Sequence, residues 1–411
     1  MTTRSGFAAF ILSACLFVMS AQAEVIVGSK VPSCAEDPGC INRIHSGAPM
    51  AVSAEPGEQI TFIGRDAGDL QLDPVRDAGL RKNPRDSFGA VHPLTGPVHI
   101  EGAVAGDVIA VTIEDIVPGN VGYTSASNFG FAADAVGTED RFIVWQLNER
   151  FAESEALPGV RIPNGSFPGV IATLPSEALL AEVLEREQAL ADVGGTVYLP
   201  DTELAEPSSL CGEEGTRAGE CLRTIPPREF GGNMDIRYLR EGVTVYLPCH
   251  VDGCGLAIGD FHYAQGDGEV AGTAIEMDAD ITVTVDIVDE PPAMPHGPHY
   301  EGPAAALAIP SERFYAVTGF PFKEKGEIPR EIAYLADAKV AELTNLSNDI
   351  NLAARNALVA MIDHIESRYG YDRTQAYMIA SVAVDLRIGQ LVDAPNVGVT
   401  AILPLDIFIA D

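Results

Sequence analysis

Apolar and polar residues alternate in short runs between about residue 54 and residue 290. Alternation with a period of two, interrupted by glycine and proline, is typical of β-strands that bury one face. The pattern therefore predicts a body of mainly antiparallel β-structure over this region. We expect its strands at 59–63, 98–102, 108–113, 243–247, 270–276 and 281–288.

Helical spacing of apolar residues replaces this alternation in two regions. The first covers residues 174–192, where leucines recur at helical spacing behind the N-cap residue Ser176. The second predicts one helix over 350–369 and then another that begins with a capping box at Asp372. We therefore expect the fold to be mainly β with an α+β portion, and its helices to concentrate in the C-terminal part, about 345–390.

The first residues have the three parts of a secretory signal peptide. Arg4 precedes an apolar run at 7–19, and Ala21-Gln-Ala23 forms a small-residue cleavage site. We predict a signal peptide at 1–23 and a mature protein, 24–411, that is secreted or periplasmic. The run of 13 apolar residues is shorter than the roughly 20 needed to span a bilayer, so we expect no membrane anchor after processing.

The chain is strongly acidic, with 59 Asp and Glu against 26 Lys and Arg and a formal net charge of −33. A negative field of this size repels nucleic acid and anionic lipid. The composition, 46% hydrophobic with 40 Gly and 28 Pro, is that of a globular protein with many turns. We therefore expect no nucleic-acid partner.

Six cysteines remain once Cys15 leaves with the signal peptide, and they form three close pairs in the sequence. In an exported protein an even number of cysteines usually forms disulfides, and local pairing is the simplest of the fifteen connectivities. A zinc site made by the third pair with His250 is the alternative. The second pair, Cys211 and Cys221, would then close an exposed insertion at about 201–219.

The densest group of ligand-capable side chains lies within residues 258–269. Its members are Asp260, His262, Gln265, Asp267 and Glu269, with glycines before, between and after them. On an extended chain, alternate residues share one face, so Asp260 and His262 would face the same way, as would the three that follow. Carboxylates and imidazoles bind divalent cations, and we interpret this stretch as an active-site strand and turn. An exposed hairpin with solvated acids is the alternative.

Two further segments carry candidate site residues. In 224–235, Gly231 and Gly232 allow a close backbone approach to either a ligand or a neighbouring strand, and Asn233 and Asp235 follow them. His92 precedes two prolines that stiffen the backbone, so it is either a ligand or acid–base group, or an exposed turn residue. Residues 120–165 show no clear period, and no chemistry is assigned to them.

Several blocks of sequence resemble the acetamidase/formamidase family, in the order in which that family has them. The blocks are residues 92–103 (HPLTGPVHIEGA), 224–235 (TIPPREFGGNMD), 259–269 (GDFHYAQGDGE), 383–387 (AVDLR) and 392–398 (VDAPNVG). The resemblance implies a β-sandwich-like body with an α+β portion. It also implies hydrolysis of a small linear carboxamide to carboxylate and ammonia. We further expect a homo-oligomer. A divalent metal is implied as well, zinc by first choice, with calcium and manganese as further candidates.

The same resemblance implies roles for individual residues. The metal would be bound by Asp260 and His262, together with His92. Glu269 or Glu276 would remove a proton from water whose pKa falls from 15.7 toward about 7, and would pass that proton to the departing nitrogen. Orientation of the amide would fall to Gln265 and Asn233, with Asp235 approaching from its own loop.

Two other functions remain open from the sequence. The same scaffold would also suit hydrolysis of a larger amide, a ureide or a carbamate. In the other alternative, the chain is an exported binding protein in which the acidic cluster holds a structural Ca²⁺ and no reaction takes place.

Overall fold

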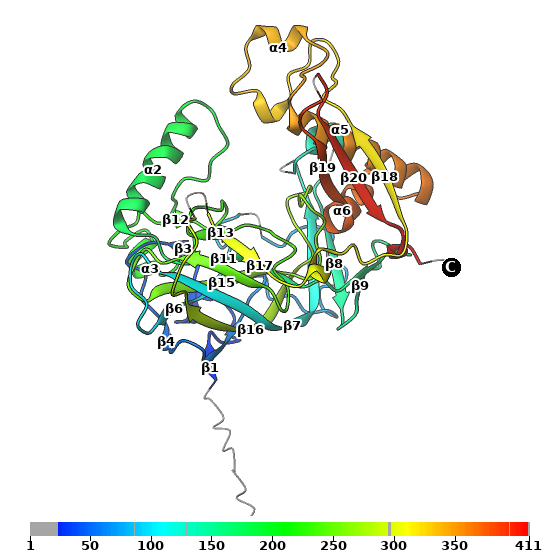
Figure 1. Ribbon diagram of the computed structural model, residues 1–411. Coiled ribbons are helices and arrows are strands. Elements are labelled where there is room, and N and C mark those ends of the chain that lie inside the picture. Colours follow the sequence, from blue (N-terminus) through cyan, green and yellow to red (C-terminus); the bar gives the residue numbers. More distant parts are fainter. Residues whose placement is uncertain are drawn as a thin grey trace, which may run out of the picture.

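The computed structural model describes residues 24–409 except residues 86, 129, 138, 295, 296 and 394. The expected signal peptide lies outside the described residues. Most strands belong to one branched sheet in the body of the molecule (Figure 1), which confirms the expected β-rich class. Its strands are β1 (Val25–Val27), β2 (Cys40–Ile41), β4 (Val52–Ala54), β5 (Gln59–Ile63), β6 (Leu94–Ile100), β7 (Val108–Ala126), β8 (Arg141–Leu147), β9 (Phe151–Glu153), β10 (Arg161–Pro163), β11 (Phe167–Ala172), β13 (Gly231–Asn233), β14 (Thr244–Pro248), β15 (Cys254–His262), β16 (Glu276–Ile287) and β17 (His299–Glu301).

The centre of this sheet runs in the order β8, β7, β16, β15, β11 and β13, and its neighbouring strands are antiparallel. Branches attach β14 to β7, β5 to β16 and β6 to β15. The short strands β3 (Arg43–Ile44) and β12 (Leu222–Arg223) pair separately. The core of the body is formed by apolar side chains from these central strands, including Trp145, Ile258, Ile281 and Val283, none of which is exposed.

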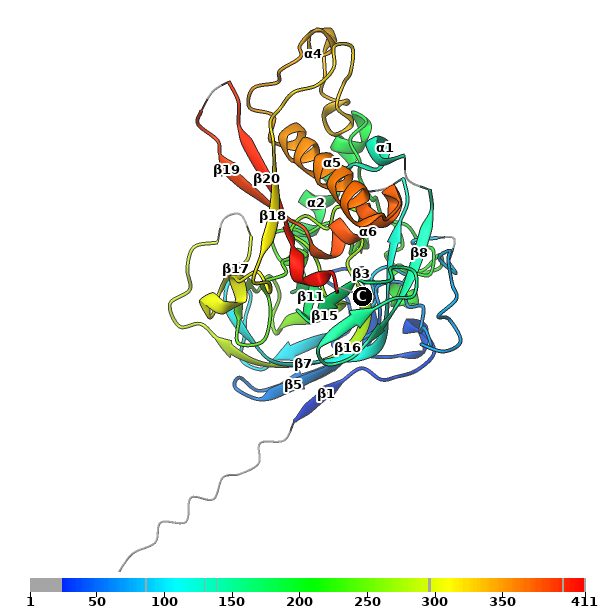
Figure 2. The same ribbon diagram turned by 90° about the vertical axis from the view of Figure 1, so that its right-hand side faces the viewer.

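The C-terminal part forms a separate three-stranded sheet, β18 (Phe314–Gly319), β20 (Gly398–Pro404) and β19 (Asp385–Gln390), packed against α5 (Ile350–Tyr369). Figure 2 shows α5 and α6 (Arg373–Ala383) between this sheet and the strand β8 of the body. Both helices were expected, and α6 has the predicted capping box at its start. The remaining helices and 3₁₀ turns are α1 (Ala133–Val136), α2 (Glu177–Asp192), α3 (Ser208–Cys211), α4 (Ala338–Glu342), η1 (Cys34–Glu36), η2 (Ala304–Leu307), η3 (Arg330–Ile332) and η4 (Leu405–Ile407).

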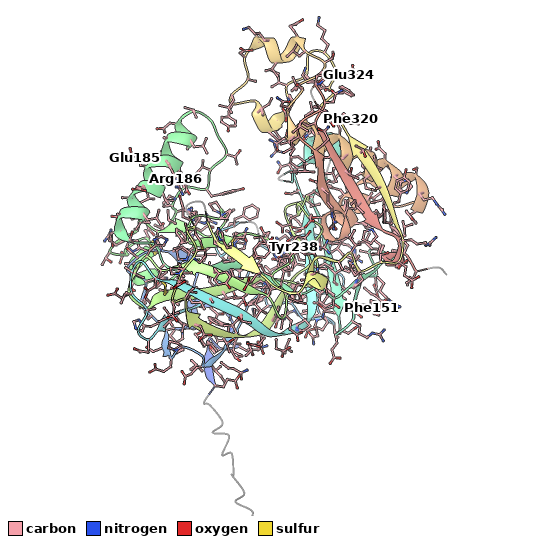
Figure 3. All side chains as sticks on the ribbon, viewed as in Figure 1. Phe151, Glu185, Arg186, Tyr238, Phe320 and Glu324 are labelled. Carbon is pink, nitrogen blue, oxygen red and sulfur yellow. A yellow bond between two sulfur atoms is a disulfide. The ribbon has the colours of Figure 1, made fainter. Side chains whose placement is uncertain are left out.

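Two elements rise from the body on opposite sides in the view of Figure 3. The labelled residues Glu185 and Arg186 mark α2 on one side. Phe320 and Glu324 mark the segment that follows β18 on the other side. Tyr238 lies low between them, where the body meets the C-terminal part. Among the described helices, none is long and apolar enough to cross a membrane.

The three expected disulfides are present, linking Cys34 to Cys40, Cys211 to Cys221 and Cys249 to Cys254. The third bridge takes the sulfurs that the alternative zinc site would have needed. It also joins the first residue after β14 to the first residue of β15, the strand that carries Asp260 and His262. The disulfide therefore anchors the start of the candidate active-site strand.

Two predictions from the alternation of residues are corrected by the structure. The strand expected at 270–276 begins only at Glu276, and the segment 263–275 is a series of turns. Backbone hydrogen bonds from Glu269 to Gly266 and from Gly272 to Glu269 close two of these turns. Gln265, Asp267 and Glu269 therefore do not share the face of an extended strand.

The second correction concerns β7, which continues to Ala126, well past the end of the expected strand at residue 113. Residues Val121, Gly122, Tyr123 and Thr124 are buried one after another, because other parts of the protein cover both faces of the strand there. A strand that is buried on both faces has no alternation, which is why the sequence pattern did not predict it.

Candidate active site

The register of the central strands places four side chains in one row. Glu276, the first residue of β16, lies opposite Tyr123 on β7 and opposite His262 on β15, and His262 lies opposite Phe167 on β11. Directly opposite residues of antiparallel strands point to the same face of a sheet. The ring of Phe167 meets the imidazole of His262 edge-on, with centroids 5.0 Å apart, and so restricts its orientation.

One cluster of ligand-capable atoms surrounds Nε2 of His262. This nitrogen lies 3.1 Å from Oε2 of Glu276 and 3.5 Å from Oδ1 of Asp260. All three side chains are buried, and each offers a ligand atom within 4.8 Å of the others. The structure therefore brings together the two predicted metal ligands, Asp260 and His262, with Glu276.

A second cluster lies on the other side of the same imidazole. Nδ1 of His262 is 4.0 Å from Oδ1 of Asp235, and Glu269 completes a group whose ligand atoms also lie within 4.8 Å of one another. His262 thus stands between two pairs of carboxylates. Four of the acidic residues predicted from the sequence meet at this one histidine.

The backbone at this site is held in an uncommon conformation. Asp235, Asp260 and Glu269 have φ values of +48°, +56° and +42°, a region that side-chain-bearing residues rarely adopt. Such strain, of order 1–3 kcal/mol per residue, persists only where the surrounding structure enforces it, and it is concentrated at functional sites.

Gly169 on β11 makes the close approach of two of these carboxylates possible. A Cβ atom at this position would lie 2.7 Å from Oδ1 of Asp235 and 2.7 Å from Oδ2 of Asp260. No side chain fits in that space, so any substitution of Gly169 would push the two acids apart. Gly231, by contrast, approaches a neighbouring strand, because its Cβ would lie 2.3 Å from the carbonyl oxygen of Ile171 on β11.

Burial and like charge act on the second pair of acids. Burial raises the pKa of Asp235 to about 8, and the neighbouring carboxylates oppose its ionisation further. Burial, followed by the charge of Asp235, also raises the pKa of Glu269 well above its ordinary value. In the metal-free protein, Asp235 therefore keeps its proton at neutral pH, and ionisation of Glu269 beside it is disfavoured.

For Asp260 and His262, attraction between opposite charges outweighs the effect of burial on the pKa values. Burial alone would raise the pKa of Asp260, but the charges of His92 and His262 outweigh it and hold that pKa at about 2. Burial alone would lower the pKa of His262, yet Glu276 and Asp260 raise it well above its ordinary value. A buried imidazolium between carboxylates stands where a cation is electrostatically favoured.

Buried polar atoms without hydrogen-bond partners also indicate that the site residues could bind a metal ion. Buried atoms without a hydrogen-bond partner include Oδ1 of Asp235, Oδ1 of Asp260, Oε2 of Glu276 and both ring nitrogens of His262. Unsatisfied buried polar atoms are costly and rare, so several that gather around one imidazole indicate that something absent from the protein satisfies them. Imidazole nitrogen with carboxylate oxygen is a donor set that zinc accepts.

His92 approaches this site from a separate loop. Its Nε2 lies 3.9 Å from Oδ2 of Asp260, while its backbone N–H donates to Oγ1 of Thr224 at 2.6 Å. The segments around residues 92 and 224, far apart in the sequence, are thereby joined. His92 belongs to neither of the two clusters above, and its role as a third ligand stays a prediction.

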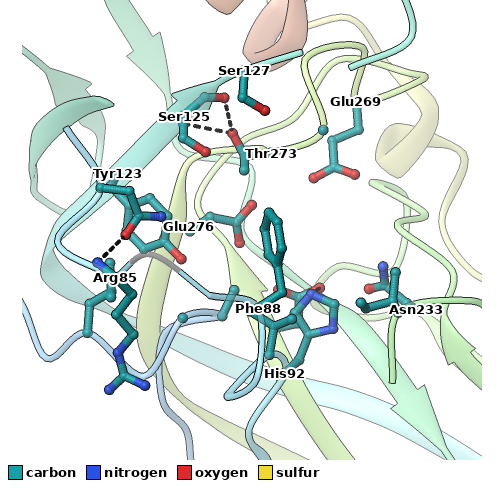
Figure 4. Close-up of a pocket in the computed structure, with 18 of the residues that line it drawn as sticks. Arg85, Phe88, His92, Tyr123, Ser125, Ser127, Asn233, Glu269, Thr273 and Glu276 are labelled. Atoms are coloured by element: carbon teal, nitrogen blue, oxygen red, sulfur yellow. Dashed lines mark hydrogen bonds and ion pairs between the residues drawn. The ribbon is translucent and has the colours of Figure 1, made fainter. Parts of the chain in front are cut away.

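A cavity of about 270 Å³ opens above these residues (Figure 4). Five of the predicted residues line it: His92, Asn233, Asp260, Glu269 and Glu276. Figure 4 shows Tyr123 and Glu276 on one side of the cavity and Asn233 on the other, with Glu269 above them.

Gln265 is placed differently from the other predicted residues. Its side chain is buried beside a smaller cavity, and its Nε2 donates to the backbone oxygen of Asp235 at 2.8 Å. That hydrogen bond ties the turn containing Gln265 to the loop of Asp235. Gln265 therefore supports the site from behind and does not line the main cavity.

Tyr123, Ser125 and Thr273 line the cavity as well, and no sequence pattern indicated them. Tyr123 stacks on Phe142, with centroids 5.0 Å apart, and the backbone N–H of Gly68 donates to its hydroxyl oxygen. Burial raises its pKa well above the ordinary value, so the hydroxyl keeps a proton that it can donate into the cavity.

The comparisons with known proteins agree with this arrangement. The sequence profile of the Acetamidase/Formamidase family matches residues 27–410. The chain belongs to the acetamidase/formamidase family. This one match contains the blocks around His92, Asp235, Asp260 and Asp385. The residues that the fold gathers at one site therefore lie in one family domain.

Individual members of the acetamidase/formamidase family show how far the similarity extends. The formamidase of Methylophilus methylotrophus is 30% identical over 393 residues, which is 89% of each chain. The acetamidase of Mycolicibacterium smegmatis is 31% identical over 373 residues, covering 82% of this chain and 84% of that one. A solved structure, the gamma lactamase from Delftia acidovorans, superposes with a TM-score of 0.82 at 29% identity, covering 95% and 94% of the two chains.

Proposed function

We propose that this chain is an exported, metal-dependent amidohydrolase that cleaves a small linear carboxamide to carboxylate and ammonia. Its family membership makes it a hydrolase of linear amides. The observation that carries the metal-dependent mechanism is the convergence of Asp260, His262 and Glu276 on one buried point, next to the cavity that Asp260 and Glu276 line.

For the metal, we propose Asp260, His262 and Glu276 as ligands, with His92 approaching Asp260. When bound, a divalent ion supplies Lewis-acid polarisation of the amide carbonyl and makes water a stronger acid. Zinc suits this mixture of nitrogen and carboxylate donors better than calcium, which prefers oxygen alone. Manganese remains compatible with the same donors.

For proton transfer, we propose Glu269. Glu276 lies 3.1 Å from Nε2 of His262 and so stands among the ligands, whereas Glu269 lines the cavity on the Asp235 side. Beside a bound cation, Glu269 would ionise despite its raised pKa. Its carboxylate would then take a proton from the attacking water and return it to the nitrogen as the carbon–nitrogen bond breaks. One water and one amide then give one carboxylic acid and one ammonia. Asp235 lies beside Glu269 and would share its proton.

Asn233 is proposed to orient the amide. Its side-chain oxygen is buried and unpartnered, and the residue lines the cavity. An amide N–H of the substrate would satisfy that oxygen. The sequence predicted this role for both Asn233 and Gln265. We assign it to Asn233 alone, because Gln265 does not line the main cavity and its amide nitrogen is bonded to the loop of Asp235.

Metal content and ammonia release together test this function. Purified protein is expected to contain about one divalent ion per chain, most often zinc, and to release ammonia from small amides. Dialysis against a chelator should abolish ammonia release, and the restored ion should recover it. Metal-free protein that hydrolyses amides at the full rate would refute the metal-dependent mechanism.

Export is proposed from the N-terminal sequence together with the three disulfides, which are rare in a reducing compartment. Protein taken from the periplasm or medium of the native host is expected to begin near Glu24. Unreduced peptide digests should contain the three local disulfide links. An intact N-terminus combined with six free thiols would contradict the proposal.

A further inference from the structure

The main cavity is larger than formamide or acetamide requires. Its volume of about 270 Å³ corresponds to roughly nine non-hydrogen atoms, if each takes the space of about 30 Å³ that a water molecule occupies in the liquid. The amide group itself has three such atoms. Acetamide adds one more, so it would leave more than half of the space to water.

The part of the wall that the catalytic groups do not use is largely apolar. It is built by three segments that are distant in the sequence: described residues between β5 and β6, the linker after α2, and the loop before β13. Apolar and aromatic side chains from these segments line the cavity, namely Leu70, Phe88, Val91, Tyr198 and Ile225. In Figure 4, Phe88 stands in front of the carboxylates, beside His92. Apolar walls with a few convergent polar groups are typical of sites for organic ligands.

The charges along the cavity disfavour an ionised substrate. Asp260, Glu269 and Glu276 all face it, whereas the basic side chains among its described lining residues are Arg85 and His92. His92 faces Asp260, and the guanidinium of Arg85 donates to the backbone oxygen of Asp69 and points away from the carboxylates in Figure 4. A carboxylate on the substrate, in addition to its amide group, would therefore meet no free cation among the described lining residues.

We propose that the physiological substrate is a neutral primary amide whose acyl group carries an apolar body of roughly six carbon atoms. The amide lies against Asn233 and the metal cluster, and the acyl body lies against Val91, Phe88 and Ile225. This inference rests on the proposed amide hydrolysis and names its substrate class. It predicts that the enzyme prefers such amides to acetamide.

A chain-length series tests the proposal. Metal-loaded enzyme is assayed for ammonia release from acetamide, butyramide, hexanamide and cyclohexanecarboxamide. Each methylene buried in an apolar site is worth about fourfold, so kcat/KM is expected to rise at least thirtyfold from acetamide to hexanamide. Butyramide should exceed succinamate, its ionised counterpart of similar length, at least tenfold. A kcat/KM that is flat or falls beyond acetamide would overturn the substrate class.

A matched pair of variants connects the preference to this wall. Ile225→Ala should lower the hexanamide-to-acetamide ratio of kcat/KM about fivefold or more, whereas Ile388→Ala, at an exposed position on β19, should leave that ratio unchanged. An equal effect of both variants would overturn the placement of the acyl group. Absence of ammonia from every amide would refute the proposed function itself, whereas turnover of acetamide without the expected rise would refute only the substrate class.

Discussion

His262→Ala is expected to lower kcat/KM for amide hydrolysis by about a thousandfold or more. Both nitrogens of this imidazole face carboxylates, Asp260 and Glu276 on one side and Asp235 on the other. Without the ring, the proposed metal loses its nitrogen ligand, and the buried acids lose the group that separates them. Ammonia release and metal content are measured on the same preparation, and both are expected to fall.

His99→Ala is the matched control for this variant. His99 lies on β6, next to β15, with its side chain 31% exposed and 3.9 Å from Glu101. It is outside both clusters of ligand-capable atoms, so its removal should change activity less than twofold. His262→Ala protein that retains its metal and full activity would exclude His262 as a ligand.

Asp385→Asn is expected to destabilise the folded protein by about 3–5 kcal/mol, because it leaves a buried guanidinium without its charge partner. Asp385, 1% exposed, pairs with Arg237, which is 8% exposed, and also with Arg387. It further accepts a hydrogen bond from the backbone N–H of Asp267 at 3.2 Å. The free energy of unfolding is measured by urea titration, monitored by fluorescence of the single tryptophan, Trp145.

The same substitution should also lower activity. Arg237 follows Asp235 by two residues, and Asp267 precedes Glu269 by two, so Asp385 anchors the two loops that carry the second acid pair. Loosening them is expected to reduce kcat about tenfold or more, even where the protein remains folded.

Asp363→Asn removes the acid, 58% exposed, of an ion pair with Arg373 and serves as the control. Exposed pairs contribute about 0–1 kcal/mol, so this variant should differ little from the native protein. If Asp385→Asn is no more destabilising than Asp363→Asn, the C-terminal part does not anchor the site.

Local residue patterns predicted the elements whose cause is local. The capping box at Asp372 and the N-cap at Ser176 depend on residues within one turn, and both are present. Strands with one more exposed face, such as β5 and β14, could also be predicted from the sequence, because burial alternates along them. Each disulfide links two cysteines that are close together in the sequence, because a short loop is easier to close than a long one.

The sequence patterns gave wrong predictions where burial on both faces, or a high glycine content, removed the link between alternation and strand structure. The part of β7 that contains Tyr123 is buried on both faces, so its period is lost, and the segment 263–275 is a chain of turns despite its alternating acids. Gln265 was expected to orient the amide, but the turn aims its side chain at the backbone of Asp235.

The sequence by itself determined the residue types at the site, the family, the acidic surface and the local pairing of cysteines, because each of these follows from composition or from residues close together. Only the tertiary structure decided which acids meet. The register of β7, β16 and β15 sets Tyr123, Glu276 and His262 side by side, and the missing side chain of Gly169 lets Asp235 approach Asp260. Those contacts join residues up to about 150 positions apart along the chain, and strand pairing over such distances is not encoded in any short stretch of sequence.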